Sequence, residues 1–193
     1  LVVGLLSLFA PHARAVNIAG TAHNLSVSGE GGIRAVDEAR VCVFCHAPHN
    51  ASPSGPLWNR PTPGSTYQPY TSATAQASPG QPTGTSLLCL SCHDGTIALG
   101  ATVASPATIE LVGGVTTMPF AQGHLGTDLS DDHPISFAYT QSLAGPSHGL
   151  VPATSLTGPV KLDAAGQVQC TSCHDPHDDR FGKFLVMGNE SGA

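Results

Sequence analysis

One five-residue pattern, C-x-x-C-H, occurs three times in this chain and uses every cysteine. It reads CVFCH at 42–46, CLSCH at 89–93 and CTSCH at 170–174. The chain has 6 Cys and 10 His in 193 residues, so random placement would rarely put a histidine directly after the second cysteine of all three pairs. The repeat therefore predicts three copies of one chemical site.

Three chemistries use paired cysteines at this spacing. In covalent attachment of c-type haem, both thiols add to the haem vinyl groups and the adjacent histidine binds the iron. Structural zinc sites usually combine two cysteine pairs, so three pairs would leave one without a partner, and zinc gives no reason for the histidine. A redox-active disulfide is typical of a βαβ context, which this sequence does not show. The pattern favours haem.

Three covalently attached haem c groups are therefore expected. Each motif supplies two thiols for attachment and one histidine as the proximal iron ligand. The predicted attachment residues are Cys42, Cys45, Cys89, Cys92, Cys170 and Cys173. The predicted proximal ligands are His46, His93 and His174.

Each iron needs a sixth ligand, and the chain offers histidine or methionine for it. Met118 and Met187 are the two methionines of the chain, so bis-histidine ligation is expected for most or all of the irons. His49 and His177 each follow a proximal histidine by three residues, which is too close to reach the far face of the same haem. As ligands they would serve a neighbouring haem, and otherwise they are surface or propionate-bonding histidines.

The remaining histidines differ in their surroundings. His133 lies in LSDDHPISF, where the apolar residues predict a buried strand, so it is a core-facing ligand candidate or a hydrogen-bonded core histidine. His23, near the start of the mature chain, is a further candidate. His124 and His148 lie in glycine-rich loops, where no ligand role is expected.

Residues 1–15 are interpreted as the remnant of a signal peptide. The apolar run over residues 1–10 is too short to cross a bilayer and is typical of a signal hydrophobic region. The letters ARA at 13–15 offer a cleavage site, and the alternative is a buried apolar N-terminal strand. Export suits c-type haem attachment, which occurs outside the bacterial cytoplasm. We expect one trihaem domain over 16–193, without His12.

Composition predicts little regular secondary structure. With 22 Gly, 16 Pro and 5% aromatic residues, the polypeptide alone offers a thin core. We expect mostly irregular coil, with short helices at the C-x-x-C-H motifs and small β-hairpins, in a compact domain organised around three covalent haems. Hairpins are expected at 107–117 and 160–170, and residues 31–42 are a short strand or one helical turn. Residues 53–86 are expected to form an irregular wrapping loop in which Trp58, Tyr67 and Tyr70 pack.

Charge and hydropathy restrict the partners. The formal charge of −6, without clustered basic residues, argues against nucleic acid. No apolar run after residue 15 is long enough for a transmembrane helix. The expected partners are redox proteins or extracellular electron acceptors.

Six stretches together resemble exported multihaem c-type cytochromes with paired C-x-x-C-H motifs. They are HNLS, CVFCHAPHN, PLWNR, LCLSCHDGTIALG, DLSDDHPISF and VQCTSCHDPHD, spread over most of residues 20–180. The resemblance implies electron transfer through closely stacked bis-histidine haems, and it points to His23, His49, His133 and His177 as the non-proximal histidines. Four candidates for three irons imply that one is not a ligand or that one reaches into a neighbouring protomer. Some relatives with four haems polymerise into extracellular filaments in this way.

Two functions follow from these expectations. The first is electron transfer without a substrate, in which every iron is six-coordinate; a polymeric extracellular filament with inter-subunit ligation is a special case of it. The alternative is a multihaem reductase, which needs one open iron position with polar or cationic groups beside it. The chain has only 7 Lys and Arg residues but several spare histidines, and this favours electron transfer.

Overall fold

Short helical turns and irregular coil, rather than long helices or wide sheets, build this fold. The computed structural model describes residues 17–120, 123–140, 143 and 150–189. The elements in chain order are η1 (Ile18–Gly20), η2 (Val41–Phe44), α1 (Gly84–His93), η3 (Val112–Gly114), β1 (Phe137–Ala138), η5 (Ala153–Ser155), β2 (Gln167–Val168) and α2 (Cys170–Cys173). The predicted coil-rich architecture with short helices is therefore confirmed. In the described part of the chain, no helix is long and apolar enough to cross a membrane.

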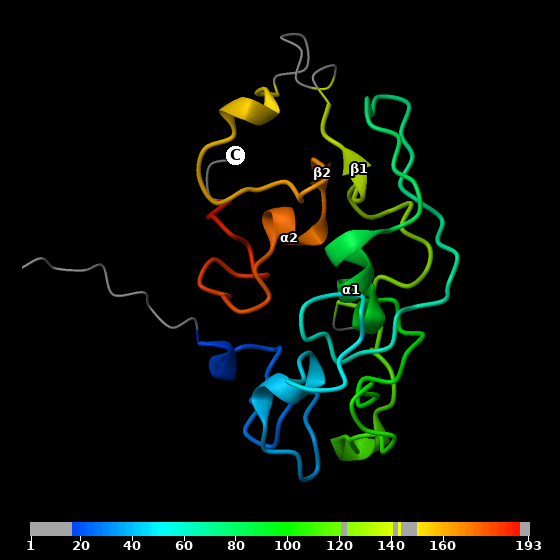
Figure 1. The fold of residues 1–193 in the computed structure, drawn as a ribbon, viewed down its shortest axis with the longest axis vertical. Coiled ribbons are helices and arrows are strands. Elements are labelled where there is room, and N and C mark those ends of the chain that lie inside the picture. Colours follow the sequence, from blue (N-terminus) through cyan, green and yellow to red (C-terminus); the bar gives the residue numbers. More distant parts are fainter. Residues whose placement is uncertain (1–16, 121–122, 141–142, 144–149, 190–193) are drawn as a thin grey trace, which may run out of the picture.

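Each C-x-x-C-H motif contains a short helix, as predicted. The first motif begins in the 3-10 helix η2, the second occupies the C-terminal half of α1, and the third begins in α2. α2 (orange) lies beside α1 (green) in the middle of the molecule, and the segment after α2 (red) extends toward the N-terminal part of the chain (blue) (Figure 1). The second and third motifs are therefore neighbours in space.

The hairpin predicted over 160–170 has the expected turn but a different strand partner. Asp163 closes the turn, because its Oδ1 accepts hydrogen bonds from the backbone N–H groups of Ala165 and Gln167, both at 2.9 Å. β2 then pairs antiparallel with β1, where Val168 lies opposite Phe137. Within 160–170 the backbone N–H of Asp163 donates to the carbonyl of Gln167 (3.0 Å), which closes the predicted hairpin turn, but the strand ladder of β2 runs to β1.

The hairpin predicted over 107–117 was wrong. Gly113 and Gly114 have φ values of 75° and 70° and form the turn η3. The segment before them pairs with another part of the chain, because the backbone N–H of Val36 donates to the carbonyl of Glu110 (2.9 Å). Burial of Leu111 in the core holds this non-local arrangement in place. In residues 31–42, whose structure the sequence left open, an isolated bridge to Leu111 precedes η2.

Two small apolar clusters form the core, and motif cysteines lie against both. The first cluster consists of Ile33, Ala35, Phe44, Leu99 and Leu111, with Cys45 and Cys92 packed against it. The second consists of Tyr67, Leu90, Leu129 and Ile135, with Leu87 and Cys170 packed against it. Tyr67 shows that the long irregular loop packs onto the domain, as predicted, and Trp58 and Tyr70 are half-buried. Motif cysteines therefore lie at the edge of each apolar cluster.

Candidate functional site

The histidine of each motif faces one histidine from elsewhere in the chain. In all three pairs the ring centroids are separated by nearly the same distance. The pairs are His46 with His177 (6.1 Å, interplanar angle 17°), His174 with His133 (6.2 Å, 12°) and His93 with His23 (6.1 Å, 73°).

This separation fits two imidazoles bound to opposite sides of one metal ion. A ring nitrogen lies about 1.2 Å from the centre of a five-membered ring whose bonds are about 1.35 Å long. Metal–imidazole bonds of about 2.0 Å then place the two centroids roughly 6.4 Å apart. Direct stacking in this molecule is closer, since the rings of His23 and Phe184 lie 4.1 Å apart. The centroid separation of each pair is therefore compatible with one metal ion bound between the two rings.

Backbone carbonyls fix the position of the ring hydrogen on three of the six imidazoles. A carbonyl only accepts hydrogen bonds, so Nδ1 carries the hydrogen in each of these rings, and in the neutral tautomer this leaves Nε2 with its lone pair. The three bonds run from Nδ1 of His93 to Gly123 (2.7 Å), from Nδ1 of His174 to Lys183 (2.8 Å) and from Nδ1 of His23 to Pro176 (2.9 Å). Metal-binding histidines are commonly oriented by such a bond from the second nitrogen.

Polar contacts and burial also shape the surroundings of His177 and His23. Nδ1 of His177 lies 3.4 Å from Oδ1 of Asp175, which also accepts the backbone N–H of His177 at 2.9 Å. Burial lowers the pKa of His23 and so favours its neutral imidazole. A neutral imidazole is the form that binds a metal.

The cysteines place the three motifs side by side, with the motif at 89–93 in the middle. Cys45 and Cys92 pack against the same apolar cluster, and burial raises the pKa of Cys45 to about 12. On the other side, the nearby Cys89 and Cys170 thiols affect each other's titration, which lowers the pKa of Cys170 to about 7 and raises that of Cys89. All six cysteines are free thiols.

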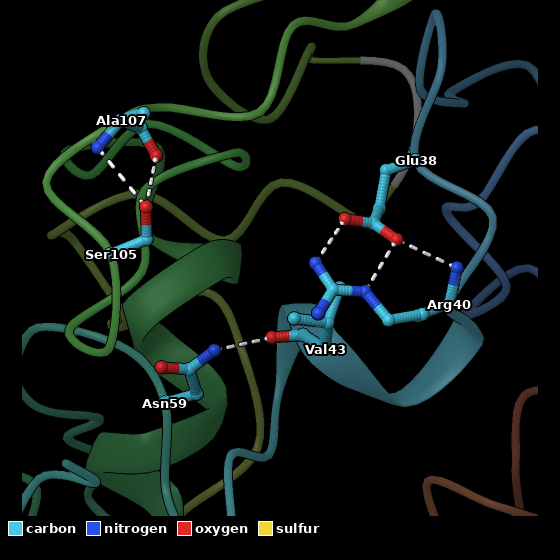
Figure 2. A network of polar contacts seen from close by, with 6 residues as sticks. All are labelled: Glu38, Arg40, Val43, Asn59, Ser105 and Ala107. Atoms are coloured by element: carbon cyan, nitrogen blue, oxygen red, sulfur yellow. Dashed lines mark hydrogen bonds and ion pairs between the residues drawn. The ribbon is translucent and has the colours of Figure 1, made fainter. Parts of the chain in front are cut away.

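Two buried residues of the PLWNR stretch join the first motif to the second. The side-chain amide of Asn59 donates to the carbonyl of Val43 inside the first motif (2.6 Å; Figure 2). The Arg60 guanidinium donates to four carbonyls and one hydroxyl around the end of α1. Its acceptors are the carbonyls of Leu99 (2.7 Å), Ser91 (2.8 Å), Ala98 (3.0 Å) and Ala101 (3.3 Å) and Oγ of Ser91 (3.1 Å).

Other candidate residues lie outside the three pairs. His49 is exposed, and the structure gives it no proximal histidine as a ring neighbour within the described residues. His124 packs on Phe120, with centroids 4.4 Å apart. Met118 packs against the first apolar cluster, whereas Met187 is exposed. His12, His148 and the predicted signal segment at 1–15 lie outside the described residues.

The predicted environment of His133 was wrong in one respect. Its side chain is exposed rather than core-facing, although Ile135 and Ser136 directly after it are buried. Pro134 and the left-handed backbone of Ser136 (φ 56°) break the strand pattern that the sequence suggested, and β1 begins only at Phe137. The His133 ring consequently lies outside the core, opposite His174.

Several residues of the site carry no signal in the sequence. The carbonyls that orient the histidines belong to Gly123, Pro176 and Lys183, and any residue type can provide a carbonyl. The ring of Phe184 that stacks on His23 is equally unmarked. Asn59 and Arg60 lie in one of the stretches that carry the family resemblance, which is the signal that could have identified them.

Searches of protein-family models and of curated proteins find no match to this chain. The class of the site therefore depends on its own geometry. It is a group of three histidine pairs, each of which includes the histidine of one C-x-x-C-H motif, in a coil-rich domain. Within the described residues, no three His, Cys, Asp or Glu side chains converge to hold an ion by themselves.

Proposed function

We propose that this chain is an exported trihaem c-type cytochrome that transfers electrons. The proposal is carried by one observation: each motif histidine faces a second histidine, at a separation suited to the two axial ligands of one iron. A haem iron leaves two axial positions for the protein, and each pair offers two imidazoles, whereas structural zinc takes four protein ligands. Bound haem would supply one-electron redox chemistry.

The residues of each centre follow from the pairs and the motifs. Thiols of the motif would attach the haem, the motif histidine would be its proximal ligand, and the facing histidine its distal ligand. Centre 1 comprises Cys42, Cys45, His46 and His177; centre 2 comprises Cys89, Cys92, His93 and His23; centre 3 comprises Cys170, Cys173, His174 and His133.

The chain holds neighbouring centres close together, which favours transfer over catalysis. Helix α1, which carries the cysteines of centre 2, packs against α2, which carries those of centre 3, and Cys45 of centre 1 shares an apolar cluster with Cys92 of centre 2. Each centre offers two imidazoles, so each pair would complete the coordination of its iron. A reductase would instead need one of these positions open for a substrate.

The first experiment counts covalent haems. The chain is produced in a host that attaches c-type haem, and its mass is measured under denaturing conditions. We expect the mass of three haems to remain on the polypeptide, and a double Cys170→Ala, Cys173→Ala variant to retain two. Thr171→Ala, an exposed position of the same motif, is the control and should retain three. A polypeptide mass without added haem would contradict the proposal.

A second experiment tests the ligand assignment by optical and EPR spectroscopy. His177→Ala should convert one of three irons to a high-spin form, because centre 1 loses its distal ligand. His49→Ala is the matched control, since it removes an exposed histidine three residues after His46 and should leave all irons low-spin. A high-spin iron in the unmodified protein would favour the reductase instead. Self-association into a filament stays a prediction, which electron microscopy of the native protein tests.

A further inference from the structure

Centre 2 differs from the other two centres in the orientation of its imidazoles. The rings of His23 and His93 are crossed at 73°, whereas the pairs of centres 1 and 3 are nearly parallel, at 17° and 12°. The centres therefore differ in the angle between the two ring planes and not in the distance between the rings, because the three centroid separations are almost equal.

The crossed orientation is fixed on the distal side by the segment after α2. Nδ1 of His23 donates to the carbonyl of Pro176 (2.9 Å), and the His23 ring stacks on Phe184 with centroids 4.1 Å apart and planes at 18°. One bond and one stacked ring together restrain both the position and the rotation of the imidazole. Phe184 therefore determines the plane in which the His23 ring lies.

The backbone around Phe184 is strained and tightly bonded. Lys183 and Phe184 have φ values of 51° and 59°, a left-handed conformation that non-glycine residues rarely adopt in succession. Hydrogen bonds hold them there: the Phe184 N–H donates to Oδ1 of Asp179 (2.7 Å), and its carbonyl accepts the N–H of Asp175 (2.8 Å). Such strain persists where the surrounding structure requires one conformation, and here it places the Phe184 ring under His23.

The proximal ring is held independently. Nδ1 of His93 donates to the carbonyl of Gly123 (2.7 Å), and the carbonyl of His93 accepts the N–H of Leu125 (2.7 Å). His93 also ends α1, so its backbone direction is set by that helix. Because the two rings are restrained by different segments, their crossing angle is a property of the fold.

We propose that Phe184 and Pro176 are positioning residues that hold His23 crossed to His93, and that this makes centre 2 electronically distinct from centres 1 and 3. The inference rests on the proposed function, because it concerns haem iron between these rings. An imidazole donates π electrons into the iron d orbital that lies perpendicular to its ring plane. Parallel rings act on one orbital and split the two dπ levels, whereas crossed rings act on one each and leave them nearly equal in energy.

Two measurable properties follow from the orbital argument. Nearly equal dπ levels give low-spin ferric iron a strongly anisotropic EPR signal with a large maximal g value, while split levels give an ordinary rhombic signal. Parallel rings also raise the energy of the dπ orbital from which the electron is lost on oxidation, so they favour the oxidised state. Crossed rings should therefore give centre 2 a higher reduction potential than the same centre would have with parallel rings.

The test is low-temperature EPR of the fully oxidised holoprotein, combined with a potentiometric titration. We expect one large-g signal and rhombic signals from the other two centres. Phe184→Ala should shift the large-g signal toward the rhombic type and lower one potential, without changing the haem count. Phe184→Tyr keeps the stacked ring and should restore the original spectrum. Phe181→Ala is the control, because Phe181 lies in the same segment, is 48% exposed and packs beside Arg180.

The outcomes separate the two proposals. Three haems with only rhombic signals would overturn the crossed arrangement and leave electron transfer intact, whereas a chain without haem would overturn the proposed function. An unchanged large-g signal in Phe184→Ala would refute the positioning role of Phe184. If Phe184→Ala does not fold, Phe184→Leu, which keeps apolar bulk but no aromatic face, takes its place with the same expected shift.

Discussion

Replacing Arg60 by methionine is predicted to destabilise the domain strongly. The guanidinium is fully buried and donates to several neutral oxygens around the end of α1. Arg60→Met keeps an unbranched apolar stem but removes the guanidinium and every donor. The carbonyl of Ala98 also accepts the N–H of Ala101 (3.0 Å), so the main loss falls on the carbonyls of Ser91 and Leu99.

The magnitude follows from these two acceptors. A buried carbonyl left without a hydrogen bond costs about 1–3 kcal/mol, so two of them cost about 2–6 kcal/mol. Removing a buried charge that has only neutral partners recovers part of its desolvation, which leaves a net loss of about 3 kcal/mol. For a domain of this size, that loss lowers the unfolding midpoint by roughly 6–12 °C.

Thermal unfolding of the haem-loaded protein, followed by circular dichroism, measures this loss. Covalent attachment would keep the haem on the unfolded chain, so variants would be compared from the same reference state. Arg40→Met is the control, because Arg40 is exposed and pairs with Glu38 at the surface, and its midpoint should be unchanged (Figure 2). An Arg60→Met midpoint equal to that of the unmodified protein would refute the reasoning, since burial of the charge would then cost as much as its hydrogen bonds contribute.

Three further predictions concern the third motif and the metal. Gly84 has φ 53° and an added Cβ would lie 3.0 Å from Nε2 of Gln169, so Gly84→Ala should lower the free energy of unfolding by roughly 1–2 kcal/mol, measured by denaturant titration. Hydrogen bonds from the Gln167 N–H and the Gln169 side chain hold the pKa of Asp163 below its ordinary value, so the stabilisation they give is present at neutral pH and is lost as the pH falls through the acid range. The difference in unfolding free energy between the unmodified protein and Asp163→Asn should therefore shrink at acid pH, and a constant difference would contradict this. Prolonged dialysis against EDTA should leave the visible spectrum of the purified protein unchanged, because iron held in a covalently attached macrocycle does not exchange, whereas loss of metal would indicate a zinc site.

Local sequence predicted the parts of this structure that depend on local geometry. The short helices at the motifs were predictable because both thiols and the histidine of a C-x-x-C-H motif must point to one side. The spacing of His177 from His174 excluded a shared centre for the two, and the structure places His177 against His46. The turn at 163–166 was predicted from DAAG between two alternating stretches, and the Asp163 side chain closes it.

Features set by tertiary contacts could not be predicted in this way. Alternating apolar residues suggested hairpins at 107–117 and 160–170, but Leu111 is buried in a cluster with distant residues and Val168 pairs with Phe137 of β1. The choice of His23 rather than His49 as the partner of a motif histidine depends on backbone carbonyls from Pro176 and Gly123, which no sequence pattern marks. The prediction of a buried environment for His133 was wrong for a similar reason, because Pro134 and the left-handed Ser136 delay the start of β1 to Phe137.

The segment over residues 174–185 contributes to all three centres, and this links the order of the chain to the order of assembly. It contains His174 of centre 3 and His177 of centre 1, and Pro176 orients His23 of centre 2. Centres 1 and 2 therefore cannot reach their final ligand geometry until the last motif has been made and folded. Under the proposed function, haem attachment at the first two motifs would precede the pairing of their axial histidines. This explains how the domain holds three centres with little regular secondary structure. Residues 174–185 contact histidines from the N-terminal, middle and C-terminal parts of the chain and so fix their relative positions.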